Sequence, residues 1–262
     1  MSDTVRKYGN PPHRVAVLHG GPGAPGYMAP VARELAKTIG VIEPLQTRDS
    51  VFGQIDELIE QLSAHADKPL TLIGSSWGAV LALFAAARNE VAIAGLILIG
   101  SAVFDAENSA KIEGLRLERL APGKRDRYHE LMSAMKSAEG EEADSLMDEW
   151  GSLFFDTDVY DPITRDLEVI EVQYELHKKV WADFVTMRDR QGYLKTEFSR
   201  IKVPVTVIHG EYDPHPIEGI RPFLQSCIDD IRFHILPDCG HYPWIERKAK
   251  DRFFRIIKTL IS

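Results

Sequence analysis

One serine of this chain has the neighbours that a nucleophile requires. Ser76 is the centre of Gly74-Ser-Ser-Trp-Gly78, which matches the pattern G-x-S-x-G. The apolar run 69–73 precedes this pentapeptide and the Ala-rich run 79–87 follows it, so the sequence predicts a strand, a sharp turn and a helix. Such an elbow lifts the serine Oγ away from the backbone, beside the unpaired N–H groups of a helix N-terminus. We therefore interpret Ser76 as a nucleophile; the alternative is a Gly-rich turn that only packs a helix on a sheet.

A histidine and an acid that would activate this serine follow two further predicted strands. A serine hydroxyl is a weak nucleophile at neutral pH, and it needs a base that a third group orients. The apolar segment 203–210 leads to Asp213, and the segment 231–236 leads to His241. Because the carboxyl ends of parallel strands meet at one edge of a sheet, we expect Ser76, Asp213 and His241 to form a catalytic triad.

A glycine-rich loop supplies the remaining component of such a site. His19-Gly-Gly-Pro-Gly23 follows the predicted strand 14–18 directly. Glycines allow backbone N–H groups to approach an oxyanion, so the N–H groups of Gly21 and Trp77 are the expected oxyanion donors. The alternative is a tight connection without a catalytic function.

With these motifs in this order, the whole chain resembles the α/β-hydrolases, and HGGPG together with S-W-G resembles their prolyl aminopeptidase (proline iminopeptidase) branch most. The resemblance implies a mostly parallel sheet flanked by helices, with a helical cap insertion. It also implies that the nucleophile is Ser76, the acid Asp213 and the base His241, with Gly21 and Trp77 as oxyanion donors.

The chain departs from that branch in several places. Relatives usually begin with an extra pair of antiparallel strands, whereas the predicted strand 14–18 lies close to the N-terminus, so we expect the sheet to be shortened at this edge. Glu211 stands where the branch tends to have an arginine. The carboxylates that hold a substrate amine in the branch lie in the cap and have no clear counterpart here.

Apolar and helical patterns divide the chain into an expected core, residues 1–104 and 200–262, and an expected cap, residues 105–199. In the core, apolar strands alternate with helical patterns, which favours a parallel sheet. The expected cap is charged and periodic and has no comparable apolar run. Its longest predicted helix covers 166–190, with an apolar face formed by Val169, Val172, Leu176, Val180, Phe184 and Met187.

Several acidic residues are alternative ligands for a substrate amine. Glu168, Glu171 and Glu175 would share one face of the predicted helix 166–190. Lysines follow them at ion-pair spacing, which favours an ordinary solvated face. Glu211 is a further candidate.

Other residues compete for the roles of acid, base or metal ligand. His209, Asp213 and His215 are close in sequence, but they lie on a strand end and a Pro-rich loop where their side chains need not converge, so we expect no metal site. Asp105, after the predicted strand 94–100, is an alternative acid. His19 more simply orders its own glycine loop.

The composition limits the partners of the chain. The 262 residues carry a formal net charge of −8 and no basic cluster, which argues against nucleic acid and anionic membranes as partners. No segment approaches the roughly 20 apolar residues that cross a bilayer, and the N-terminus lacks an apolar signal core, so we expect a cytoplasmic protein. Cys227 and Cys239 are not expected to form a disulfide. The sequence does not indicate an oligomeric state.

Together these features predict a serine hydrolase without a metal or cofactor. It would cleave an ester or amide bond of a small molecule or short peptide through an acyl-enzyme on Ser76. An aminopeptidase-like enzyme and a small-molecule carboxylesterase are both open. A ligand-binding protein that uses the same fold without turnover is the third alternative.

Overall fold

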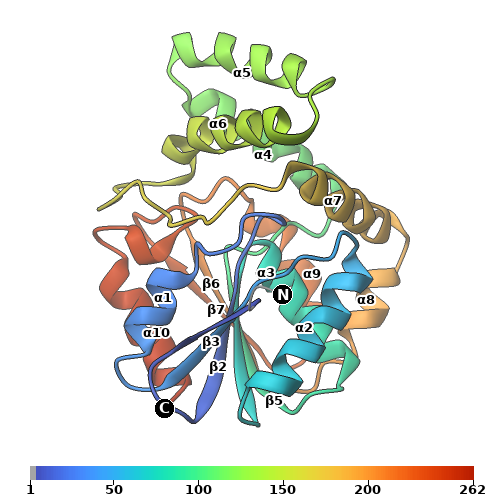
Figure 1. Ribbon diagram of the computed structural model, residues 1–262, viewed down its shortest axis with the longest axis vertical. Helices are drawn as coiled ribbons and strands as arrows, with labels where there is room; N and C mark the ends of the chain where they lie inside the picture. Colours follow the sequence, from blue (N-terminus) through green and yellow to red (C-terminus); the bar gives the residue numbers. More distant parts are fainter. Residues whose placement is uncertain (1–3) are drawn as a thin grey trace.

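The computed structural model describes residues 4–262, and its centre is one seven-stranded sheet (Figure 1). The spatial order of the strands is β1-β3-β2-β4-β5-β6-β7. Every neighbouring pair is parallel except β1 with β3. The predicted mostly parallel sheet is therefore confirmed. The strands are β1 (Val5–Tyr8), β2 (His13–Leu18), β3 (Gly40–Pro44), β4 (Leu70–Ser75), β5 (Ile93–Ile99), β6 (Val205–Gly210) and β7 (Ile231–Leu236).

The N-terminal edge of the sheet carries a single antiparallel strand, β1, where relatives were expected to carry a pair. This strand was not among the predicted ones. Two of its polar side chains bind one buried carboxylate of β3: Arg6 Nε donates to Glu43 Oε2 at 2.9 Å and Tyr8 OH donates to the same oxygen at 2.6 Å. The edge is thus shortened, as predicted, and Glu43 holds the strand that remains.

Helices cover both faces of the sheet (Figure 1). One face packs against α1 (Ala29–Leu35) and α10 (Lys250–Leu260), and the other packs against α2 (Val51–His65), α3 (Trp77–Arg88), α8 (Tyr193–Phe198) and α9 (Arg221–Gln225). Alternate strand residues serve opposite faces, so that Ala16 and Leu18 contact the α2–α3 side while Val15 and Val17 contact the α1–α10 side. This alternation explains why the central strands are apolar throughout.

Of the helices between β5 and β6, all but α8 lie above the carboxyl edge of the sheet (Figure 1). We call these four helices, with their connections, the helical cap; the first three share a small apolar core of their own, whereas the fourth packs against the main core through Val180 and Phe184. Within residues 4–262 no helix is both long and apolar enough to cross a bilayer. The cap helices are α4 (Ala106–Arg119), α5 (Pro122–Ala134), α6 (Gly140–Asp158) and α7 (Tyr174–Asp189).

The prediction of one long helix over 166–190 is wrong at its N-terminal end, because α7 begins only at Tyr174. The preceding residues bind the glycine-rich loop instead: Ile170 N–H donates to Pro25 O and Gln173 N–H donates to Gly23 O, both at 2.9 Å. Glu168 has a positive φ of 58°, which no α-helix contains. Glu168 and Glu171 therefore do not share a helix face with Glu175, so the alternative of an amine site on that face has no helix to carry it.

We predict that Gly78→Ala destabilises the protein because α3 packs closely on the end of β2. A Cβ at Gly78 would lie 2.3 Å from Leu18 O, which is backbone that cannot rotate away. Overpacking of this kind should lower the free energy of unfolding by about 2 kcal/mol, measured by urea denaturation.

Gly114→Ala is the matched control, since Gly114 lies on α4 with nothing within 4 Å of the added Cβ. Alanine there should raise the free energy of unfolding by up to about 1 kcal/mol through helix propensity. Equal effects of the two substitutions would show that close packing at the elbow is not what Gly78 provides.

Candidate active site

Ser76 lies at the turn between β4 and α3, as the motif predicted. It is the N-cap residue of α3 and has φ 53° and ψ −114°, a conformation that residues other than glycine rarely adopt. The side chain is partly exposed, whereas the neighbouring Ser75 is fully buried. The backbone strain therefore keeps the Ser76 side chain, and not that of Ser75, at the surface of the turn.

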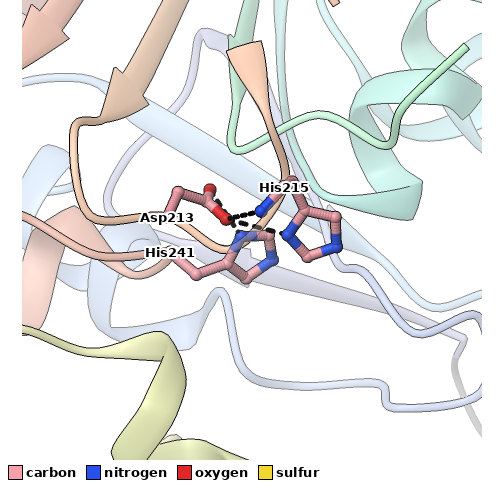
Figure 2. Close-up of side chains that lie close together, drawn as sticks. All are labelled: Asp213, His215 and His241. Carbon is pink, nitrogen blue, oxygen red and sulfur yellow. Dashed lines mark hydrogen bonds and ion pairs between the residues drawn. The ribbon is translucent and has the colours of Figure 1, made fainter. Parts of the chain in front are cut away.

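Asp213 and His241 meet beyond the ends of β6 and β7 (Figure 2). His241 Nδ1–H donates to Asp213 Oδ2 at 2.8 Å, and both side chains are buried. Gly100, at the end of β5, provides the space for this pair. A Cβ there would lie 2.9 Å from His241 Nδ1 and 3.0 Å from Asp213 Oδ2. The sequence analysis placed Gly100 at the end of the predicted strand 94–100 but missed that this glycine makes room for the pair.

The charges of the pair reinforce one another. Burial raises the pKa of Asp213, but the charges of His241, His215 and His209 outweigh burial and hold that pKa well below its usual range. Burial lowers the pKa of His241, and the charge and hydrogen bond of Asp213 outweigh it, so the pKa of His241 is raised above the ordinary histidine value. Asp213 is thus an anion that stabilises the protonated form of His241.

Ser76 and His241 line the same cavity, which has a volume of about 700 Å³. Among residues 4–262, no hydrogen bond joins Ser76 Oγ to His241; the bond of the His241 ring is the one to Asp213. In ligand-free sites such bonds are often long and shorten when the substrate binds. The structure therefore brings Asp213 and His241 into contact and places Ser76 on the same cavity.

Asp105, the alternative acid, has a different function in the structure. Its side chain accepts a hydrogen bond from Asn108 N–H at 2.8 Å and caps the N-terminus of α4. Asp213 is the carboxylate that contacts His241.

The glycine-rich loop forms another wall of the cavity, which Gly21 and Gly23 line. His19 Nδ1–H donates to Gly20 O at 2.9 Å and His19 Nε2 accepts from Gln46 N–H at 3.3 Å. Burial lowers the pKa of His19 to about 4, so this histidine is neutral and orders the loop. Trp77 is the first residue of α3, and its backbone N–H is therefore one of the donors without a partner inside the helix.

The cap holds the glycine-rich loop through a residue that the sequence analysis missed. His177, on α7, donates from Nδ1 to Pro22 O at 2.9 Å and lines the cavity. Its position on an ordinary amphipathic helix carried no signal. The loop with the expected oxyanion donor Gly21 is thus positioned by the cap as well as by β2.

The loop of His241 is held by a buried carboxylate, Glu246, which the sequence analysis also missed. Glu246 accepts from the backbone N–H groups of Tyr160, Asp161 and Gly240 at 2.7, 2.7 and 2.8 Å. His241 N–H itself donates to Asp158 O at 2.7 Å. The end of α6 and the His241 loop therefore form one connected unit.

The expectation that the side chains of His209, Asp213 and His215 need not converge is wrong. His215 donates to Asp213 Oδ1 from its backbone N–H at 2.9 Å and from Nδ1 at 2.8 Å, while His209 Nδ1 lies 3.8 Å from Oδ2. The turn after β6 folds His215 back onto the aspartate. Asp213, His215 and His241 each offer a ligand atom within 4.8 Å of the others. A metal ion bound there would have to displace the imidazole N–H donors that now occupy both oxygens of Asp213.

The cap side of the cavity is apolar and aromatic, with several charged groups. Arg116 lines it and is neutralised by Asp158, which accepts from Arg116 Nε at 2.8 Å. Glu113 and Asp148 also line the cavity, and Glu113 accepts a hydrogen bond from Tyr128 OH. Glu211 is exposed and lies outside the cavity lining, so its position does not support a contact with substrate.

The chain is similar to a known protein family and to several solved structures. A model described as the alpha/beta hydrolase family matches residues 15–255. A comparison with curated proteins finds no match. The crystal structure of VinJ is 21% identical over 98% of this chain and 93% of that chain, with a TM-score of 0.69.

Two further solved structures are similar. A proline iminopeptidase of Mycobacterium smegmatis is 20% identical over 98% of this chain and 93% of that chain, with a TM-score of 0.64. A structure from a study of carboxylesterases of the thaumarchaeon Nitrososphaera gargenis is 18% identical over the same shares, also with a TM-score of 0.64. These likenesses confirm the predicted α/β-hydrolase fold, and at such identities they show the fold alone.

We predict that Asp213→Asn lowers the pKa of His241, because the substitution removes the negative charge that stabilises the imidazolium. NMR titration of histidine-labelled protein measures this pKa, and a His241→Gln spectrum assigns the signal. Asp56→Asn, on the surface of α2, is the control and should leave the titration unchanged. A His241 pKa that stays constant or rises in Asp213→Asn would contradict the electrostatic account.

We also predict that Glu246→Gln destabilises the fold by about 2 kcal/mol. An amide presents one oxygen where the carboxylate presents two, so at least one buried backbone N–H would lose its acceptor. Chemical denaturation measures the difference, with the exposed Glu90→Gln as control. A loss within about 0.5 kcal/mol, as for ordinary surface positions, would show that Glu246 is not a structural acceptor.

Proposed function

Because the chain belongs to the alpha/beta hydrolase family, we propose that it is a serine hydrolase that cleaves an ester or amide bond of a small substrate through an acyl-enzyme on Ser76. One observation carries the proposal. His241, hydrogen-bonded to the buried Asp213, and the strained Ser76 elbow line a single cavity at the carboxyl edge of the sheet. This is the arrangement that an activated serine nucleophile needs.

In the proposed first step, Ser76 Oγ attacks the acyl carbon while His241 Nε2 takes its proton. Asp213 accepts the hydrogen bond from His241 Nδ1–H, which holds Nε2 unprotonated and then stabilises the imidazolium. The N–H groups of Gly21 and Trp77 stabilise the oxyanion. The loss of one such donor typically raises the barrier by about 3 kcal/mol.

In the proposed second step, His241 gives its proton to the leaving group, and the acyl-enzyme remains on Ser76. A water molecule then enters, His241 Nε2 takes a proton from it, and the resulting hydroxide attacks the acyl carbon. Ser76 leaves as the alkoxide and recovers its proton from His241. Each residue therefore returns to its starting state, and the step needs no metal ion.

The cavity supports two substrate classes, and different residues favour each. Its aromatic cap residues, among them Trp150 and Phe154, suit the apolar acyl or alcohol part of a small ester. Glu113 and Asp148 supply the carboxylates that an aminopeptidase needs for a free amine, and a proline iminopeptidase is among the similar structures. We propose a small-molecule ester or a short peptide as substrate.

We predict that Ser76→Ala lowers the turnover of nitrophenyl esters or naphthylamides by at least about a thousandfold and abolishes labelling by a fluorophosphonate probe. Ser75→Ala is the matched control. Ser75 Oγ is buried without a hydrogen-bond partner among residues 4–262, and this variant should keep both activities. A wild-type protein that neither turns over these substrates nor takes up the probe would favour the ligand-binding alternative.

We predict that the amine of the substrate separates the two enzyme classes. Matched proline and alanine naphthylamides are compared with their N-acylated forms, beside short-chain nitrophenyl esters. Turnover that disappears on N-acylation would establish the aminopeptidase, with Glu113→Gln as the first variant to raise KM. Turnover of esters alone would establish the carboxylesterase.

A further inference from the structure

The carboxylate of Asp213 binds two imidazoles, one on each oxygen (Figure 2). His241 Nδ1 lies 2.8 Å from Oδ2 and His215 Nδ1 lies 2.8 Å from Oδ1. The reaction proposed above requires only the first contact. The second imidazole is largely shielded, with 12% of the His215 side chain exposed against 4% for His241, and it needs its own explanation, because a polar ring is ordered only at a cost in side-chain freedom.

The second ring also contacts the proposed base directly. The centroids of His215 and His241 are 4.5 Å apart and their planes differ by 25°, so the two rings are stacked. Both rings line the cavity that contains Ser76. His215 therefore contacts one face of His241 and one oxygen of Asp213 at the same time.

Two hydrogen bonds fix the backbone of His215. Its own backbone N–H donates to Asp213 Oδ1 at 2.9 Å, and its carbonyl accepts from His209 Nε2–H at 3.0 Å. His209 is the penultimate residue of β6 and is buried, so the sheet itself anchors this turn. The backbone of His215 is thus held on both sides, and the hydrogen bond from Nδ1 to Asp213 Oδ1 orients the ring.

We propose that His215 is a positioning residue for the hydrolysis assigned to Ser76, and the proposal rests on that function. It holds the second oxygen of Asp213, which prevents the carboxylate from rotating about its Cβ–Cγ bond. It also stacks on His241, which limits the tilt of the base. His215 acts through these two residues and transfers no proton itself.

The charge of the three groups is consistent with this function. Burial lowers the pKa of His215 more than Asp213 raises it, whereas the pKa of His241 is raised, so a proton taken up by the pair of imidazoles is held on His241 in preference to His215. The N–H of His215 withdraws electron density from Asp213, so its loss would leave the carboxylate a stronger partner for the imidazolium. Removal of this hydrogen bond should therefore raise the pKa of His241.

Other ionisable groups face His241 and remain constant in the experiment. Arg116 and Asp158 form an ion pair from the cap, and their charges act on His241 in opposite directions. Among residues 4–262, the ionisable groups that contact His241 or act on it through their charge include Asp213, His215, His209, Asp158, Arg116 and Tyr242.

Two substitutions separate the hydrogen bond from the ring. His215→Asn retains a donor where Nδ1–H now lies and loses the stacked ring, whereas His215→Phe retains a ring and loses the donor. We predict that His215→Phe lowers kcat/KM at neutral pH about tenfold, through kcat with KM unchanged, which is the usual size of coupling within one hydrogen-bond network. The acid limb of its pH profile should move to higher pH, because a His241 with a raised pKa becomes protonated, and so inactive as a base, at a higher pH. His215→Asn should keep the acid limb of the wild type.

A second readout does not depend on turnover. NMR titration of His241 should show a raised pKa in His215→Phe and a wild-type value in His215→Asn, with His65→Asn on α2 as the control. His215→Ala removes the ring without adding bulk and should give the same upward shift, so the test stands even where Phe disturbs folding.

The outcomes separate the inference from the proposed function. Failure of Ser76→Ala to change turnover or labelling would overturn the proposed function, and the titration would still test the contact between His215 and Asp213. A wild-type acid limb and a wild-type His241 titration in both His215→Phe and His215→Ala would overturn the inference. A rise in KM with unchanged kcat would overturn it too, because it would make His215 a substrate contact.

Discussion

A carboxylate that is shielded from water needs a donor at each oxygen, since an unpaired buried charge costs several kcal/mol. Asp213 meets this condition with the imidazole of His241 on one oxygen and that of His215 on the other. The donors come from loops after different strands, and Gly100, directly after a third strand, leaves room for them. The ends of β5, β6 and β7 must therefore keep their register for the charge to stay satisfied, which ties the site to the geometry of the sheet.

The cap is held to this edge by backbone hydrogen bonds at two places. The segment before α7 donates to the glycine-rich loop, where His177 also binds Pro22 O. The segment after α6 donates to Glu246, which also accepts from the loop of His241. Asp158 contributes twice, because its carboxylate pairs with Arg116 in the cavity wall and its carbonyl accepts from His241 N–H. Asp158 therefore links Arg116, in the cavity wall, directly to the backbone of the proposed base.

Local sequence carried much of the information about the fold. The alternation of side chains along β2, with Val15 and Val17 on one face and Leu18 on the other, follows from strand geometry and was readable as an apolar run. The elbow at Ser76 could also be predicted locally, because a five-residue motif is enough to specify this turn from a strand into a helix. The α/β-hydrolase fold predicted from these patterns is confirmed, whereas the catalytic roles of the site residues and the boundaries at 105 and 199 stay predictions.

The sequence by itself determined where Ser76, Asp213 and His241 stand relative to the strands, because each lies in the turn or loop that follows an apolar run. Only the tertiary structure decided what contacts them. Glu246, His177 and the late start of α7 depend on backbone groups far away in the chain, and no local pattern encodes those partners. The convergence of His215 on Asp213 likewise depends on how the turn after β6 folds back. Propensity and periodicity describe a residue's neighbours in sequence, whereas a buried charge selects its donors from whatever the packed sheet brings within hydrogen-bond distance.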